Sequence, residues 1–148
     1  IQDGEVVNRE IRFPVDPAAR PNIAAVDPIA AALASIVESA RSPDKTFHLC
    51  HPSPQTNAEI FGLVMEAFGI RDKIRLLFVR EMHKPLTRTE DIALRAFRVY
   101  LPYLNAPIKF DCTHTRELLP GYTGMFQPAT VDYLRKVIAF ERSERSQR

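Results

Sequence analysis

Histidines and cysteines gather in two stretches of this sequence and could together hold a metal ion. The first stretch carries His48, Cys50 and His51, and the second carries Cys112 and His114. If both stretches are strands, alternate side chains share a face, so each stretch offers two ligands and the four together suit a structural zinc. The spacing matches no known zinc pattern, however, so we predict no metal site. We interpret the cysteines as reduced core thiols, with a single disulfide left open.

Tyr133 and Lys136 come nearest to a tyrosine–lysine dyad, in which an ammonium group lowers the pKa of a phenol and orients a ribose. That chemistry needs the pattern YxxxK on a helix. Here the spacing is one residue short, so we expect Lys136 to pair with Asp132 instead. The five glycines are scattered and form no GxGxxG fingerprint for a pyrophosphate. No serine stands in a nucleophile-elbow context. We therefore predict neither a catalytic nor a cofactor-binding residue.

The net charge of +2 is too small to indicate nucleic-acid binding. A basic cluster does occur in the middle of the sequence, but Glu81, Glu90 and Asp91 lie among its members, so we predict no nucleic-acid partner. The cluster consists of Arg71, Lys73, Arg75, Arg80, Lys84, Arg88, Arg95 and Arg98.

Length and composition are those of one globular domain, with 45% apolar and 26% charged residues over 148 positions. No apolar run is long enough to span a membrane and no signal-peptide pattern is evident, so we expect a cytoplasmic protein. The sequence opens on Ile1 and not on methionine. We expect a single domain over residues 1–148 that is a piece of a longer protein.

The most sharply defined unit of the sequence ends at Gly69. Residues 46–50 alternate apolar and polar side chains, which predicts a short strand. Two prolines then end that strand, because they lack the backbone donor that a ladder needs. Thr56 and Glu59 form the capping box of an amphipathic helix over 57–68, and Gly69 supplies its left-handed stop.

Further strands and helices are predicted on both sides of this unit. A proline limits residues 11–15 to an edge strand, and residues 22–26 form a second strand. Asp27 is expected to cap a helix that starts at Pro28 and ends near Arg41. Downstream we predict a buried strand over 74–79, a helix capped by Thr87 and Glu90 with an Asp91–Arg95 pair, a strand over 108–111, a helix over 113–119 and a helix from Pro128 onward.

Four segments, taken in order, resemble the C-terminal part of the extended short-chain dehydrogenases/reductases. RPNIAAVDPIA (20–30) is similar to the family's strand, Val-Asp and helix, and TFHLC (46–50) with the helix ending at Gly69 is similar to its next strand–helix unit. FDCTHTR (110–116) resembles an element of the thioester-reductase and fatty-acyl-reductase (male-sterility-type) branch. LPGY (119–122), followed by Pro128 and a helix, resembles the ending common to extended members. The resemblance spans most of residues 11–142.

The resemblance implies an NAD(P)-dependent oxidoreductase or epimerase whose N-terminal Rossmann half binds the nucleotide and supplies the tyrosine–lysine dyad. This chain would be the substrate-binding part, inactive alone, and the missing nucleotide-binding half would be its partner. NAD(P) is thus implied for the parent protein and for no residue of this chain. Arg20 is the one residue nominated for binding the small-molecule substrate, as an anion contact, against the alternative of an ordinary turn arginine.

We therefore expect an α+β fold with a small mixed sheet and about four main helices, equivalent to the C-terminal half of an extended Rossmann-type reductase. Because the strand over 74–79 should be buried on both faces, the chain alone is expected to self-associate or to rearrange. The alternative is an independent, non-catalytic α+β module that binds a protein partner.

Overall fold

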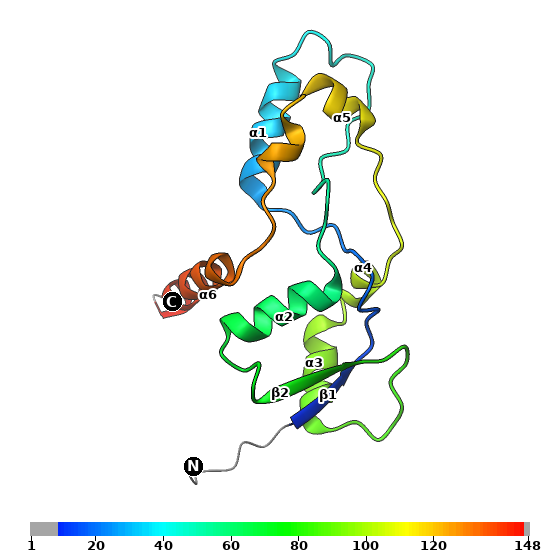
Figure 1. Ribbon diagram of the computed structural model, residues 1–148, viewed down its shortest axis with the longest axis vertical. Coiled ribbons are helices and arrows are strands. Elements are labelled where there is room, and N and C mark those ends of the chain that lie inside the picture. Colours follow the sequence, from blue (N-terminus) through cyan, green and yellow to red (C-terminus); the bar gives the residue numbers. More distant parts are fainter. Residues whose placement is uncertain (1–8, 147–148) are drawn as a thin grey trace. The chain divides into compact units, whose positions relative to one another are not determined.

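The computed structural model describes residues 9–146, which fall into two compact units. The sheet unit consists of residues 9–19, 56–106 and 129–146, and the thiol unit consists of residues 20–55 and 107–128. Figure 1 traces both units along the chain. The prediction of one domain over residues 1–148 stays a prediction.

The sheet unit is built on two parallel strands, β1 (Arg9–Phe13) and β2 (Ile74–Phe78). Arg9 stands opposite Ile74 in the register, and Phe13 stands opposite Phe78. In the described part of the chain, six α-helices accompany this sheet, so the expected combination of helices with a small sheet is confirmed. The sheet itself is a parallel pair and not a mixed one, and β2 is only half-buried where full burial was predicted.

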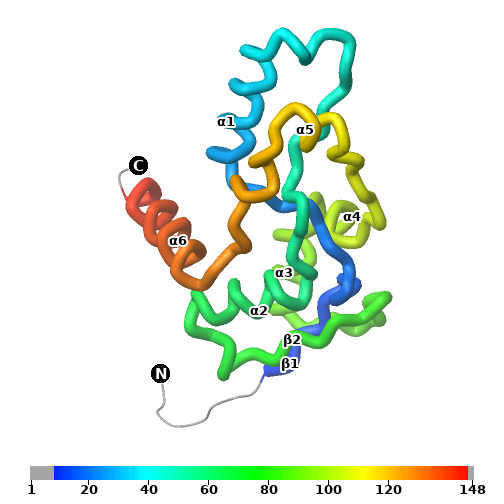
Figure 2. Tube along the Cα trace, turned by 45° about the horizontal axis from the view of Figure 1, so that its top comes forward, coloured from blue at the N-terminus to red at the C-terminus, as the bar shows by residue number. Residues whose placement is uncertain are grey.

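The sheet unit also contains four helices: α2 (Asn57–Ala67), α3 (Arg88–Phe97), the short α4 (Leu101–Leu104) and α6 (Val131–Ser146). Phe13 at the end of β1 is buried and meets two rings edge-on, Phe61 of α2 at 5.1 Å and Phe97 of α3 at 5.2 Å between centroids. The side chain of Phe13 therefore packs both α2 and α3 against the sheet. Helix α6 lies beside α2 in Figures 1 and 2 and has no fully buried residue.

The thiol unit contains α1 (Val26–Val37), α5 (Thr113–Leu118) and the 3₁₀ turn η1 (Tyr122–Met125). Tyr122 is fully buried and packs edge-on against Phe126, with 4.9 Å between ring centroids. The core of the unit is one cluster, formed by Ala32, Cys50, Cys112, Tyr122 and Phe126.

The predicted strands over 22–26, 46–50 and 108–111 are wrong, because none of these segments pairs with another in the described structure. At Cys50 and His51, side chains take the place of a neighbouring strand. The Tyr122 hydroxyl accepts from the Cys50 amide at 2.6 Å and donates to the Cys50 carbonyl. The Asn22 side chain likewise bonds both the amide and the carbonyl of His51, at 2.9 and 3.0 Å. The amides and carbonyls of these two residues are thus satisfied without a ladder.

Both predicted capping boxes are confirmed. Thr56 Oγ1 accepts from the Glu59 amide at 3.2 Å, and the Glu59 carboxylate accepts from the Thr56 amide at 2.6 Å. Gly69 has the predicted left-handed backbone, with φ of 67°. Thr87 and Glu90 repeat the arrangement at the start of α3, where Asp91 and Arg95 also form their expected ion pair at 2.9 Å.

Two helix starts differ from the prediction. Helix α1 begins at Val26, with Ala25 as its N-cap and no side-chain cap bond, so Asp27 as the cap is wrong. Asp27 lies instead in the first turn, where its charge still favours the positive end of the helix dipole. The helix ends at Val37 and not near Arg41, and α6 begins at Val131, three residues after Pro128.

Replacing Thr56 with alanine should lower the free energy of unfolding by about 1 kcal/mol, because the Glu59 amide loses its acceptor. Chemical denaturation followed by circular dichroism measures the loss. Thr89 offers a matched control, since it is exposed in the first turn of α3 and Thr89→Ala removes no cap; its stability should change by less than about 0.5 kcal/mol. Equal losses for the two variants would show that α2 does not depend on its cap.

Glu90 is a buried carboxylate, 1% exposed, at the outer edge of β1. It accepts from the Arg12 amide at 3.1 Å, from Arg12 Nε and Nη2 at 2.7 and 2.9 Å, and from the Thr87 amide at 2.8 Å. The Arg12 guanidinium, and then the backbone donors, hold the pKa of Glu90 well below its usual range. Arg12 also donates to the carbonyls of His83 and Pro85, at 3.1 and 2.9 Å. Strand, helix and loop therefore meet at this pair.

Glu90→Gln should lower the free energy of unfolding at pH 7 by about 3 kcal/mol. This is the lower end of the range for breaking a buried ion pair, because a third of the Arg12 side chain is exposed. The native pKa of Glu90 lies below the unfolded value of 4.5, so its stabilisation is present above pH 4.5 and disappears as the pH falls. The stability curves of wild type and variant should therefore converge below pH 4.5. A constant difference across that range would contradict the assignment.

Candidate binding site at the ends of the parallel strands

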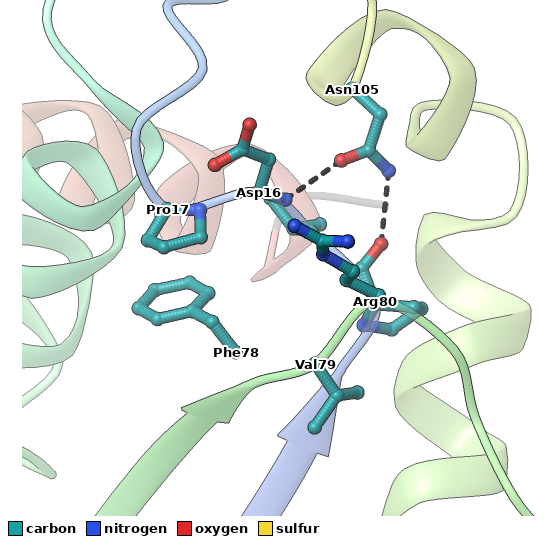
Figure 3. A pocket seen from close by; sticks show the side chains of 8 residues that line it. Asp16, Pro17, Phe78, Val79, Arg80 and Asn105 are labelled. Atoms are coloured by element: carbon teal, nitrogen blue, oxygen red, sulfur yellow. Dashed lines mark hydrogen bonds between the residues drawn. The ribbon is translucent and has the colours of Figure 1, made fainter.

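A pocket of about 600 Å³ opens in the sheet unit where β1 and β2 end. In open α/β sheets, ligands bind outside the carboxyl ends of parallel strands, and this pocket has that position. It is shown in Figure 3. The lining residues are Pro14, Val15, Asp16, Pro17, Phe78, Val79, Arg80 and Asn105.

The pairing of β1 with β2 ends at the mouth of the pocket, where a local hydrogen bond replaces the next bond between the strands. The Val79 amide makes the last bond of the pair, to the Phe13 carbonyl at 3.0 Å, and the Val15 amide donates to the same oxygen at 2.9 Å. The Val15 amide is the next group of β1 that alternation turns toward β2, and because it is used in this local bond, pairing stops here. The continuation of β1 diverges from β2, and the space between them becomes the pocket.

Asn105, which follows α4, fixes the wall formed by the residues after β1. Its Oδ1 accepts from the Asp16 amide at 2.8 Å, and its Nδ2 donates to the Pro14 carbonyl at 2.9 Å. Figure 3 shows this double contact across the pocket. The side-chain amide of Asn105 thus makes the two backbone hydrogen bonds, to Pro14 and Asp16, that a neighbouring strand would otherwise make.

Asn57, the first residue of α2, holds the same wall from the interior. It is fully buried, and its Nδ2 donates to the carbonyls of Asp16 and Leu104, both at 2.8 Å. Its Oδ1 is buried without a hydrogen-bond partner among the residues that the structure describes, an arrangement that a bound water can satisfy. Helix α2, which begins with the Thr56 capping box, therefore also fixes the position of Asp16 in the pocket wall.

Arg80 supplies the pocket's positive charge. It is exposed, and within residues 9–146 its side chain forms no ion pair. In Figure 3 the guanidinium lies beside Asp16 and Asn105, and the rings of Pro17 and Phe78 lie on its left. The arrangement offers a planar cation, a carboxylate and an apolar floor. It suits a small molecule that carries an anionic group next to an apolar part.

Arg20, the residue predicted to bind substrate, lies in the thiol unit and is not part of this pocket. It is exposed, and its Nη1 donates to the Pro54 carbonyl at 2.7 Å. Its role as an anion contact stays a prediction. Asn57, Asn105 and Arg80 were not identified as site residues from the sequence. Arg80 appeared there only as a member of the basic cluster.

The histidines considered as metal ligands bond the backbone instead. Nδ1 of His48 lies 2.8 Å from the Asp111 carbonyl, and Nδ1 of His114 lies 3.1 Å from the Thr46 carbonyl. No group of three or more metal-binding side chains occurs in the described part of the chain. Asp132 pairs with Arg135 at 3.4 Å, so the expected pair with Lys136 is wrong.

No helix among residues 9–146 is both long enough and apolar enough to cross a membrane. Comparison with known proteins gives no relative: no family model matches the chain, and no curated protein or solved structure matches it significantly.

Asn105→Ala should release the wall of the pocket, since two bonds to Pro14 and Asp16 are lost. We expect faster hydrogen exchange over residues 14–19 and a loss of about 1 kcal/mol in stability, because both bonds are partly exposed to water. Arg80→Ala is the matched control in the same pocket, as Arg80 bonds nothing in the described structure, and it should leave both quantities unchanged. Unchanged exchange in Asn105→Ala would mean that Asn57 alone holds the wall.

Proposed function

We propose that this chain is the substrate-binding part of an NAD(P)-dependent oxidoreductase or epimerase of the extended short-chain type, inactive by itself. The observation that carries the proposal is the pocket at the carboxyl ends of the β1–β2 pair, because that is where α/β proteins hold their ligands. The order of four family-like segments along residues 11–142 supports the same conclusion.

The apolar surface of α1 supports the presence of a further partner. One side of the helix, with Ala32 and Ile36, is buried in the thiol unit. Leu33 and Val37 stand on another side and remain exposed, Val37 by 73%. A helix that is apolar on more than one side is ordinarily covered on each of them. We assign the cover to the nucleotide-binding half, since helices pack on sheets in such reductases.

The outer edge of β2 supports the proposal in the sheet unit. The Val79 amide faces β1, so alternation turns the amides of Leu76 and Phe78 the other way. No described residue accepts from them. Parallel sheets of two strands are rarely left uncovered, because their backbone edges invite further pairing. In the proposed parent enzyme this edge is covered by the other half.

In this proposal the two halves divide the chemistry. The nucleotide-binding half would hold NAD(P)H, which carries the hydride, and would provide the glycine turn for the pyrophosphate and the tyrosine–lysine dyad. The pocket supplies substrate binding: Arg80 meets an anionic group, and Phe78 with Pro17 contacts an apolar part. None of the lining residues is a glycine, so a backbone cradle for a dinucleotide is not part of this pocket.

The isolated chain should bind neither NADH nor NADPH at micromolar concentration and should show no reductase or epimerase turnover. Fluorescence titration measures binding, and light scattering in parallel should report species larger than a monomer, because uncovered apolar surface associates. The parent reading frame upstream of Ile1 should encode a glycine fingerprint followed by YxxxK. Saturable cofactor binding by a monomer would contradict the proposal and favour an independent module.

A further inference from the structure

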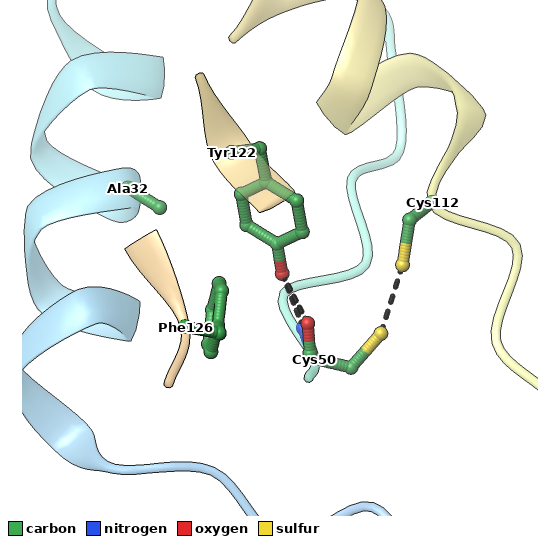
Figure 4. Packing of buried hydrophobic residues seen from close by; sticks show 5 residues of the cluster. All are labelled: Ala32, Cys50, Cys112, Tyr122 and Phe126. Atoms are coloured by element: carbon green, nitrogen blue, oxygen red, sulfur yellow. Dashed lines mark hydrogen bonds between the residues drawn. The ribbon is translucent and has the colours of Figure 1, made fainter. Parts of the chain in front are cut away.

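Cys50 and Cys112 place their sulfur atoms against each other in the core of the thiol unit. The two residues are 62 positions apart in the sequence, and their Sγ atoms are 2.8 Å apart. Both are free thiols and buried, 7% and 4% exposed. Figure 4 shows the two side chains pointing toward each other from separate segments. A disulfide bond of about 2.05 Å would bring the sulfur atoms only about 0.8 Å closer.

The backbones that carry these thiols are held by bonds that do not involve sulfur. The Tyr122 hydroxyl bonds both backbone groups of Cys50. Thr115 of α5, three residues after Cys112, donates from Oγ1 to the His48 carbonyl at 2.9 Å. The two segments are therefore held close to each other independently of the sulfur atoms.

We propose that Cys50 and Cys112 form a reversible disulfide, a two-electron redox site whose oxidant is a hydroperoxide. The bond ties the segment over 46–51 to the start of α5. Because this segment has no strand neighbour in the described structure, the cross-link would add a covalent restraint where only side-chain hydrogen bonds act.

The reaction balances with hydrogen peroxide as the co-reactant. One thiol loses its proton and its sulfur attacks a peroxide oxygen, which breaks the O–O bond and releases hydroxide that becomes water. The sulfenic acid that results is attacked by the second sulfur. Its S–O bond breaks, and the leaving hydroxide takes the second thiol proton to form another water. Two thiols are oxidised by two electrons, and one peroxide is reduced to two waters.

The surroundings of the pair make this exchange slow in both directions. Burial, followed by the contact with Cys112, raises the pKa of Cys50 to about 12, so that Cys50 remains a neutral thiol near pH 7. Neutral thiols attack peroxide and disulfides poorly. The reduced pair should therefore respond only to sustained oxidation. Both sulfur atoms are also buried away from an external thiolate, so the oxidised form should resist brief exposure to a reductant.

The full chain tests the proposal after reduction, removal of the reductant and exposure to hydrogen peroxide. Denaturation with a thiol-alkylating reagent, followed by intact mass, counts the remaining thiols. We expect a product two hydrogens lighter with no alkylation, a cross-linked peptide that joins the segments of Cys50 and Cys112, and recovery of two thiols after dithiothreitol. The midpoint of thermal unfolding should rise by several degrees in the oxidised form, because the cross-link restricts the unfolded chain.

Single variants separate the pair from other oxidation. Cys50→Ser and Cys112→Ser keep one thiol each, so neither should lose the two hydrogens nor gain in unfolding midpoint after peroxide. If a serine variant fails to fold, the wild-type peptide map decides alone. Two alkylated thiols after prolonged peroxide, or sulfinic acids without a cross-linked peptide, would overturn the proposal.

Discussion

The carboxylate of Glu90 is the constraint on which the sheet unit depends. Two parallel strands have little stability of their own, because their edges expose backbone groups to any competing partner. Glu90 closes the outer edge of β1 by accepting from the Arg12 amide, and it starts α3 by accepting from the Thr87 amide. Through Arg12 it also holds the loop at His83 and Pro85. That loop begins at Arg80, so the charge in the pocket stands on a segment that the buried pair anchors.

The two units solve the same problem of backbone satisfaction with different groups. The sheet unit uses a ladder and then, where the ladder ends, the amides of Asn57 and Asn105. The thiol unit replaces the ladder altogether with Asn22, Thr115 and Tyr122. Side-chain partners fix a segment at a few points, whereas a strand fixes every residue. The core of the thiol unit consequently rests on a small number of contacts, and the two sulfur atoms are among them.

A feature can be predicted from the sequence when the residues that determine it are close together along the chain. The boxes at Thr56 and Thr87 involve residues three positions apart, so their pattern is visible in the sequence and correct. A strand also requires a second strand to pair with. Residues 46–50 show the alternation of a strand, but they have no strand partner, and the Cys50 amide bonds the Tyr122 side chain instead. The Arg12–Glu90 pair spans 78 positions, and the contacts of Asn105 reach back to Pro14 and Asp16. Nothing in the local pattern marks such residues.

The interleaving of the units constrains the order in which the molecule can form. The partner of β1 is β2, which lies 65 positions later in the sequence, and residues 20–55 between them belong to the thiol unit. At a synthesis rate of roughly 5–20 residues per second, β1 waits on the order of several seconds before it can pair. The first segment of the thiol unit waits in the same way, because it needs residues 107–128. Neither unit can fold as a continuous piece during translation. Assembly is therefore a late, non-local event, with the slow folding that long-range pairing imposes.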